Sequence, residues 1–300
     1  MLLVLLILFV GSAVFVKDFL SVVNLQGLLL AVSTVGMVSS TMLFCLASGN
    51  FDLSVGSVLA CSGVVSAVVM NKTGSVALGI AAGLGSGAVI GLVNGLIVAK
   101  GKINALITTL ASMEIVQGLA YIVSNGRAVG ISQESFFVLG NSAFLKLPVP
   151  VWFCLICFAL FGVLLQCTTF GRHTMAIGGN EQAARLTGIP VARTKIIIFT
   201  MQGFVAAFAG IVLAARMTSG QPMTSYGFEL EVISACVLGG VSLAGGVGTM
   251  GFVIAGVLIM GIVQNVMDLL NIAPFYQLVA RGLILLGAVA LDRLKQVLRV

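Results

Sequence analysis

Apolar runs of roughly 16 to 23 residues recur along this 300-residue chain, each close to the ~20 residues that a helix needs to cross a bilayer. Hydrophobic residues make up 59% of the chain and charged residues only 8%, which leaves too little polar surface for a soluble domain. The strict apolar-polar alternation of a membrane β-barrel is missing. The sequence therefore predicts an all-α integral membrane protein.

About ten transmembrane helices fit these runs, within one membrane domain that covers residues 1–300. The first run has no basic segment before it, so we expect a retained span rather than a secretory signal. The approximate ranges of the predicted spans are 2–16, 27–47, 55–70, 76–99, 103–123, 150–166, 195–215, 229–243, 249–270 and 275–291.

The basic residues of the connecting segments predict the orientation in the membrane. With ten spans, the side that holds both termini carries Lys100, Lys102, Arg172, Arg185, Arg193, Lys195, Arg293, Lys295 and Arg299. The opposite side carries Lys17, Lys72, Arg127, Lys146 and Arg216. Cytoplasmic loops are enriched in Lys and Arg, so both termini are expected in the cytoplasm. These residues do not cluster with aromatics on one face, which argues against nucleic-acid binding.

Two features indicate how the spans pack. Glycine recurs at every fourth position from Gly79 to Gly95, a spacing that favours close helix contact in lipid. A weak internal similarity relates residues 91–111 to residues 261–282. It predicts two inverted repeats, at approximately 27–123 and 195–291, and a transport route between such halves.

A polar segment, residues 167–195, separates the two halves. Asn180 is a predicted N-cap and Glu181 adds negative charge to the first helical turn, while Gly188 and Pro190 end the helix. Ala184 and Leu186 contribute an apolar side. A helix of two turns is too short to be stable alone, so it is expected to pack on the membrane domain or on a partner.

Four stretches of the chain then suggest a family. They are CLASGNFDLSVGSVLA (45–60), KINALITTLASMEIVQGLAYI (102–122), AIGGNEQAARLTGIPVARTK (176–195) and MTSGQPMTSYGFELEVISACVLGGVSLAGGVG (217–248). Together they resemble the membrane permeases of bacterial ATP-binding cassette (ABC) importers for monosaccharides, the ribose-type family, and within it the L-arabinose permeases most. The resemblance covers essentially the whole chain, apart from a cytoplasmic N-terminal extension that such permeases usually carry.

The resemblance implies a homodimeric, type II-like ABC importer permease in the bacterial inner membrane, which imports L-arabinose or another pentose. It also implies two cytoplasmic ATPase subunits, which bind ATP and Mg, and a periplasmic sugar-binding protein. This chain lacks a Walker motif, so we expect it to bind no ATP or other cofactor itself. His173 is its only histidine and Cys154 and Cys157 form its only C-x-x-C pair, so we expect no metal site. We expect a translocation subunit and not an enzyme. By the same resemblance, the ATPase-coupling residues are Gly178, Gly179, Asn180, Glu181, Ala184, Arg185, Leu186, Gly188 and Pro190.

Polar side chains within the spans are the remaining candidates. Glu114 and Arg281 fall near the middles of two spans, where they either pair with each other or line the route. Amides and hydroxyls could hydrogen-bond a sugar or could equally satisfy neighbouring helices. The tentative substrate pathway consists of Asn94, Asn104, Thr108, Gln117 and Asn265, with Thr109 and Gln264 as further members.

Two other classes of function stay open. A secondary transporter driven by an ion gradient could use Glu114 or Asp268 as its ion site. An intramembrane enzyme would need a catalytic set, and His173 is the chain's only histidine.

Overall fold

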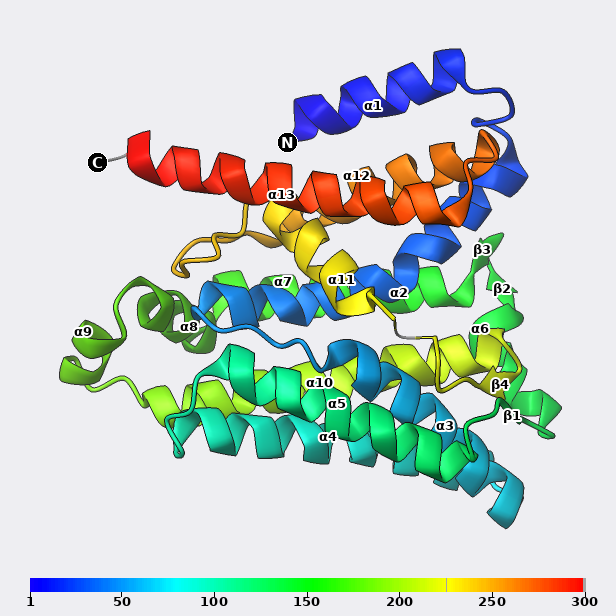
Figure 1. The fold of residues 1–300 in the computed structure, drawn as a ribbon, viewed down its shortest axis with the longest axis horizontal. Helices are drawn as coiled ribbons and strands as arrows, with labels where there is room; N and C mark the ends of the chain where they lie inside the picture. The colour runs from blue at the N-terminus through cyan, green and yellow to red at the C-terminus, as the bar shows by residue number, and fades with distance from the viewer. Residues whose placement is uncertain (225, 299–300) are drawn as a thin grey trace.

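The computed structural model describes residues 1–224 and 226–298, and the side chains of those up to residue 290. Thirteen α-helices account for most of these residues (Figure 1). They are α1 (Leu2–Phe15), α2 (Val22–Ala47), α3 (Val55–Thr73), α4 (Val76–Ala99), α5 (Ala105–Ser124), α6 (Val138–Asn141), α7 (Val149–Cys167), α8 (Thr169–Gly179), α9 (Glu181–Leu186), α10 (Val191–Arg216), α11 (Phe228–Leu238), α12 (Met250–Leu269) and α13 (Pro274–Leu298).

The extended elements are four two-residue strands near one end of the bundle. β1 (Val129–Gly130) pairs antiparallel with β4 (Ser219–Gly220), which joins the segment after α5 to the segment after α10. β2 (Ala143–Phe144) and β3 (Leu147–Pro148) form a hairpin before α7, and the 3-10 helix η1 (Glu134–Phe137) precedes α6. We call this end the strand end, and the opposite end, where α8 and α9 lie, the α9 end (Figure 1).

Every predicted span contains a helix, but the predicted number of ten is not confirmed. Seven helices are long and apolar enough to cross a membrane: α2, α3, α4, α5, α7, α10 and α12. α1 has 14 residues and α11 has 11, and in the part of α13 whose side chains the structure describes the apolar stretch is Pro274–Ala290. The predicted span 229–243 was too long because the chain turns after Gly239, and Gly240 has a φ of 81°.

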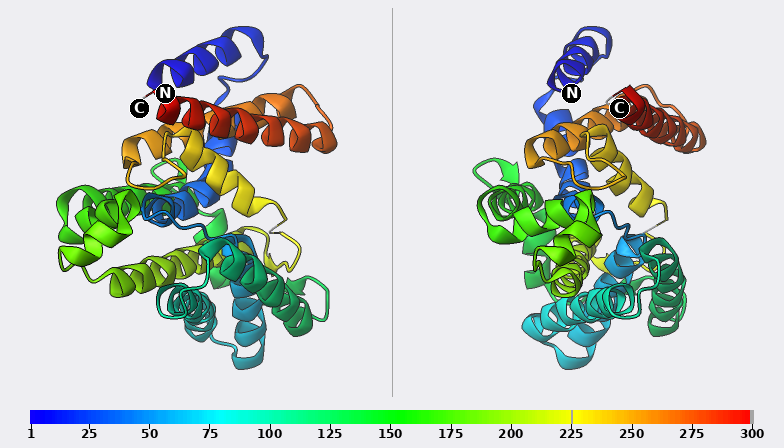
Figure 2. Two further views of the ribbon diagram at one scale, coloured as in Figure 1. Left: turned by 60° about the vertical axis from the view of Figure 1, so that its left-hand side comes forward. Right: turned by 90° about the vertical axis from the view of Figure 1, so that its left-hand side faces the viewer.

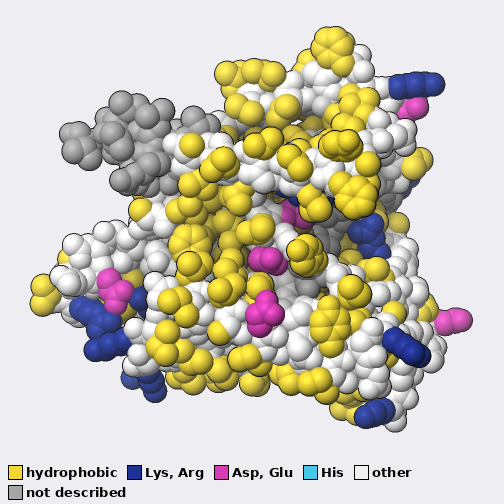
Figure 3. Space-filling model, in the orientation of Figure 1, with side chains coloured by type: hydrophobic (Ala, Val, Ile, Leu, Met, Phe, Trp, Pro, Cys, Tyr) yellow, Lys and Arg dark blue, Asp and Glu magenta, His cyan; other side chains and the backbone are white. Residues whose placement is uncertain are grey.

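Two long helices form the centre of the bundle. α2 is buried almost throughout its second half, and α10 packs against α2, α3 and α4. In both views of Figure 2, α1 and α13 lie at one edge and α3, α4 and α5 at the opposite edge. The outer helices expose large aliphatic side chains, as helices that face hydrocarbon do, and Figure 3 shows them as a broad apolar surface between basic groups at the two ends.

The glycines of α4 allow close helix contacts, as the sequence predicted. A Cβ at Gly87 would lie 2.4 Å from the Gly203 carbonyl oxygen of α10, and one at Gly91 would lie 2.2 Å from the Phe199 oxygen. Towards α3, a Cβ at Gly83 would lie 2.9 Å from the Ser62 oxygen. Larger residues at these positions would separate the helices, so the stripe fixes α4 between α3 and α10.

Two helices, α3 and α11, begin inside the bundle rather than at its ends. After α2 reaches the α9 end, residues 48–54 turn back into the bundle, and α3 runs from there to the strand end (Figure 1). After α10 reaches the strand end, the described residues of 217–227 turn back in the same way, and α11 runs towards the α9 end. We call these segments the first and second breaks.

Candidate coupling helix and polar pockets

The α8–α9 segment projects from one end of the bundle (Figure 1). The Asn180 side chain accepts a hydrogen bond from the Ala183 amide at 3.0 Å, and Gly188 has a φ of 84°, so the predicted cap and stop of α9 are confirmed. α8 was not predicted. Its signal was Thr168, whose hydroxyl accepts from the Gly171 amide at 3.3 Å as an N-cap.

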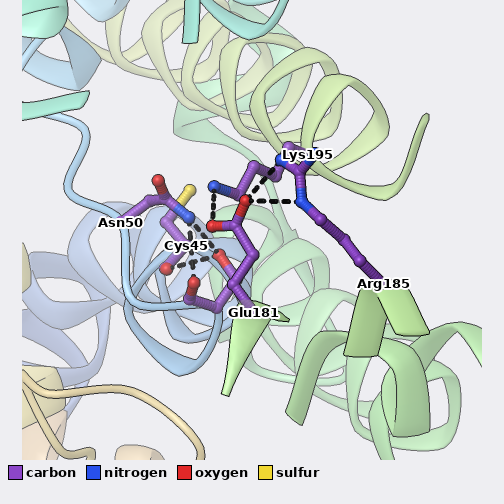
Figure 4. Close-up of polar contacts among 6 residues, drawn as sticks. Cys45, Asn50, Glu181, Arg185 and Lys195 are labelled. Atoms are coloured by element: carbon purple, nitrogen blue, oxygen red, sulfur yellow. Dashed lines mark hydrogen bonds and ion pairs between the residues drawn. The ribbon is translucent and has the colours of Figure 1, made fainter. Parts of the chain in front are cut away.

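Glu181 joins α9 to the start of α10 through two ion pairs (Figure 4). Its carboxylate lies 2.6 Å from the Arg185 guanidinium, one turn along α9, and 2.7 Å from the Lys195 ammonium. Partial burial acts to raise the pKa of Glu181, but the hydrogen bonds from Lys195 and Arg185 outweigh it and hold the pKa below its usual range. Glu181 is therefore engaged within the chain, and Arg185, half-exposed, is the more available of the two for a partner.

The two apolar residues predicted for one side of α9 have opposite environments. Ala184 is buried against Ile177 and Val191, which attaches α9 to α8 and α10. Leu186 is 89% exposed, and it lies at the tip of the projecting segment. An exposed leucine on a structured helix is available for contact with another protein.

Backbone contacts connect the end of α8 to both halves of the bundle. A Cβ at Gly178 would lie 1.8 Å from the Ala47 carbonyl oxygen at the end of α2 and 2.5 Å from the Gly246 nitrogen. The Gly246 amide also donates to that Ala47 oxygen at 2.8 Å. The end of α8 is therefore in tight contact with α2 and with the loop before α12.

Two of the predicted pathway residues, Asn94 and Thr108, line one apolar groove between α4 and α5, and most of the set make hydrogen bonds within the bundle. Asn94 donates to the Ser54 hydroxyl at 3.0 Å, and Gln117 donates to the Pro222 carbonyl at 2.6 Å. Asn104 caps α5 by accepting from the Leu106 amide, and Thr109 accepts from the Leu53 amide. The Thr108 hydroxyl is buried without a hydrogen-bond partner in the described part of the chain, beside an apolar groove between α4 and α5.

The predicted pairing of Glu114 with Arg281 was wrong. The Arg281 guanidinium lies 3.4 Å from the Glu231 carboxylate, because α13 packs against α11 and not against the middle of α5. Glu114 is exposed on α5. Figure 3 shows acidic side chains within the apolar surface of this face, a position that is costly in lipid unless water or another chain covers it.

Two polar pockets lie at opposite ends of the bundle. The pocket at the α9 end, of about 490 Å³, lies between the first break, the α4–α5 turn and α9, and includes Glu181, Arg185 and Lys195. The pocket at the strand end, of about 400 Å³, lies between α2, α10, α11 and α12. Of the predicted pathway residues, Asn265 and Gln264 line this second pocket.

Comparison with known proteins identifies the family. Residues 24–289 match the family described as "Branched-chain amino acid transport system / permease component". The chain belongs to this permease family. The matched region begins in α2 and ends in α13, so it contains both breaks, the α8–α9 segment and both polar pockets.

Several permeases are similar over nearly their whole length. The chain is 63% identical to the L-arabinose transport system permease protein AraH of Escherichia coli over 296 residues, which cover 99% of this chain and 90% of AraH. It is 53% identical to the L-arabinose ABC transporter permease protein AraH of Azospirillum brasilense, covering 98% and 86%. It is 40% identical to the ribose import permease protein RbsC of Bacillus subtilis, covering 93% and 87%. No solved structure matches this permease.

Proposed function

We propose that this permease is the membrane-spanning subunit of an ATP-driven importer for L-arabinose or another pentose. The observation that carries the proposal is the 63% identity to an L-arabinose permease across 99% of the chain. The ribose permease, at 40%, lies clearly further away, which favours L-arabinose as the sugar. ATP and Mg would be bound by partner ATPase subunits, since the chain has no phosphate-binding motif.

Within this proposal the bundle consists of two inverted repeats with about ten spans in all. α2 and α10 both have 26 residues, and each is followed by a break that contains Ser-Gly, directly after α2 and two residues after α10, and that leads to a helix starting inside the bundle. α2 runs towards the α9 end and α10 away from it, and the same reversal relates α3 to α11 (Figure 1). The turns before α5 and α13 also match, because Lys102 and Asn271 have φ values of 55° and 54° and each precedes an isoleucine.

The α9 end is the cytoplasmic end in this proposal. Six of its connecting residues are basic: Lys100, Lys102, Arg172, Arg185, Arg193 and Lys195. α1 starts in the direction of this end and α13 returns to it, which agrees with cytoplasmic termini in the inner membrane (Figure 1). The side chains of Arg293, Lys295 and Arg299 lie outside those described.

The proposed partners follow from the two ends and the exposed face. The cytoplasmic ATPase would bind α9 through Leu186 and Arg185, and the periplasmic sugar-binding protein would dock at the strand end. A second copy of the permease, with membrane lipid around the pair, would cover the face that carries Glu114. Substrate would cross between the repeats when ATP hydrolysis moves α8 and α9.

Reconstitution tests the proposal directly. The permease would be placed in liposomes with its ATPase and with the sugar-binding protein outside, and uptake of radiolabelled L-arabinose would be measured. We expect uptake only when the ATPase and ATP are present inside the liposomes. ATP-independent accumulation of the sugar would refute the proposal.

The role of α9 can be tested at its exposed tip. Leu186→Ala removes apolar contact area that packs on nothing in this chain, so thermal stability should not change. ATP-driven uptake should fall by about tenfold, as it does when a central interface residue is truncated. Leu186→Met, which retains the apolar volume, is the matched control and should transport normally.

An ion-gradient-driven secondary transporter is the alternative, and the exposed Glu114 is the observation that favours it. In that case, Glu114→Gln would abolish uptake driven by a proton or sodium gradient. Under our proposal no such gradient drives uptake in the wild type.

A further inference from the structure

We infer that the pocket at the strand end is a binding site for the transported sugar, formed by α2, α10, α11 and α12. This inference rests on the proposed function for the class of ligand. The geometry itself is independent of it. The volume of about 400 Å³ lies within the range of about 300–1,000 Å³ that is typical of small-molecule sites.

The pocket extends from the strand end towards the middle of the bundle. Gly27 and Thr34, on α2, follow the first residue of that helix by 5 and 12 positions, which places them about 8 and 18 Å along it. α12 ends at Leu269. Asp268 lies one position before this last residue, and Val257 lies 12 positions before it. Phe228, at the start of α11, lies within the bundle because α11 begins at the second break (Figure 1).

Three polar side chains of the pocket lack a partner in the described part of the chain. Thr34 is only 8% exposed, yet its hydroxyl makes no hydrogen bond. The side chains of Gln264 and Arg216 also line the pocket and make no hydrogen bond or ion pair. Polar groups that line a cavity without a protein partner are available to a ligand or to the water that it displaces.

The other polar groups of the pocket are already engaged and hold its walls in place. Asn265 and Asn24 exchange hydrogen bonds of 2.8 and 3.0 Å between α12 and α2. Asp268 accepts from Gln277 at 2.9 Å, and Glu231 pairs with Arg281. The predicted pathway residue Asn265 is therefore a positioning residue, while Gln264 beside it is the one that faces a ligand.

This lining suits an uncharged polyol. A sugar presents hydroxyl groups that both donate and accept, which matches the amide of Gln264 and the hydroxyl of Thr34. Phe228 and Val257 offer apolar surface to the C–H face of a sugar ring. A lipid chain would leave the three unpaired groups unsatisfied, so we assign the pocket to the sugar.

Filling the pocket tests the assignment. A Cβ at Gly27 would meet nothing within 4 Å, so Gly27→Phe places a ring at the pocket without an initial clash. Gly251, also on a pocket helix, has the same open surroundings but does not line the pocket, so Gly251→Phe is the matched control. In the reconstituted importer, ATP hydrolysis stimulated by the sugar-loaded binding protein is measured beside uptake.

We expect Gly27→Phe to lower L-arabinose uptake by at least about tenfold while stimulated ATP hydrolysis stays within about twofold of wild type. Gly251→Phe should leave both within that range. Wild-type uptake by Gly27→Phe would overturn the site. Absence of ATP-driven uptake in the wild type would instead contradict the proposed function.

A labelling experiment keeps the site testable if Gly27→Phe does not assemble. Gln264→Cys, in a Cys167→Ser background, is treated with a membrane-impermeant thiol reagent from the binding-protein side. Saturating L-arabinose should slow labelling at least about threefold, whereas sucrose of equal osmolarity should not. No labelling, or no protection by L-arabinose, overturns the site. Protection by L-leucine alone overturns the sugar assignment and shows separately that the proposed substrate is wrong.

Discussion

The two breaks follow the same backbone plan but have opposite polar environments. In the first break, Asp52 and Ser54 are each 1% exposed, and the Asp52 carboxylate accepts from the Ser54 amide at 2.9 Å and hydroxyl at 2.6 Å. Asn94 then donates to the Ser54 hydroxyl, which completes a closed network. Next to the second break, by contrast, Thr34 and Arg216 face an open pocket without partners in the described part of the chain.

This difference shows how one supersecondary unit can serve two purposes. A break exposes backbone groups inside a membrane protein, and each must be satisfied by side chains or by water. The first break is closed by Asp52 and Ser54 together with Asn94 of α4. The second break is held by hydrogen bonds within it, from the Gln221 side-chain amide to the Ser219 hydroxyl and from the Thr224 hydroxyl to the Gln221 carbonyl. The unpaired groups beside it face the pocket from α2 and α10, so we expect the two regions to respond differently to substitution.

The largest effect is expected where the first break begins. Gly178→Ala would place a Cβ 1.8 Å from the Ala47 carbonyl oxygen, which belongs to the backbone and cannot rotate away. We expect a loss of about 3 kcal/mol, the upper end of typical overpacking costs, measured as a lower thermal midpoint in detergent. Gly179→Ala meets nothing within 4 Å and should be neutral or slightly stabilising. Equal behaviour of the two variants would contradict the tight contact.

The closed network of the first break gives the next largest effect. Asp52→Ala leaves the buried amide and hydroxyl of Ser54 without their acceptor, which should cost about 2 kcal/mol of stability. Asp52→Asn keeps an oxygen at the same position and is the control. Denaturation of both variants in the same detergent compares the loss of stability in Asp52→Ala with that in Asp52→Asn. An Asp52→Ala variant as stable as wild type would show that this carboxylate does not hold the break.

The sequence predicted the parts of the molecule that depend on local chemistry. The Asn180 cap, the stop at Gly188 and the close packing of the α4 glycines could be predicted because a single residue type determines each. Helices were also predicted correctly wherever apolar runs were long. α8 was missed, because 11 residues of mixed polarity resemble a loop.

The site could not be predicted in the same way, because it depends on which helices are neighbours. Asn94, Gln117 and Asn265 are all amides in apolar spans, and the sequence does not distinguish one that braces a break from one that lines a pocket. The sequence also did not show which carboxylate pairs with Arg281, because that depends on which helices pack together. Glu231 lies 50 positions away in the chain, and only the contact of α11 with α13 brings the two together.

A smaller effect is expected at Glu181, and it should depend on pH. Because the pKa of Glu181 is lowered in the folded protein, its ion pairs stabilise α9 above the ordinary carboxyl value of 4.5 and are lost as pH falls below it. Glu181→Gln should therefore be less stable than wild type at pH 7, and the difference should shrink as the pH falls below 4.5 and disappear once it is below the lowered pKa of Glu181. The carboxylate is partly exposed, so the pH 7 difference should lie within about 1 kcal/mol. A difference that persists at low pH would mean that packing, and not charge, is what the substitution removes.

The smallest effect on stability is expected in the pocket of the second break. The Thr34 hydroxyl lines the pocket and makes no hydrogen bond in the described part of the chain, so Thr34→Val removes no hydrogen bond within the protein and keeps nearly the same shape. Its thermal stability should stay within about 0.5 kcal/mol of wild type, because no protein hydrogen bond is lost. Uptake of L-arabinose should nevertheless fall, because the lost hydroxyl faced the substrate. If Thr34→Val were as destabilising as Asp52→Ala, the Thr34 hydroxyl would be engaged within the protein as the Asp52 carboxylate is, and the contrast between the two regions would be wrong.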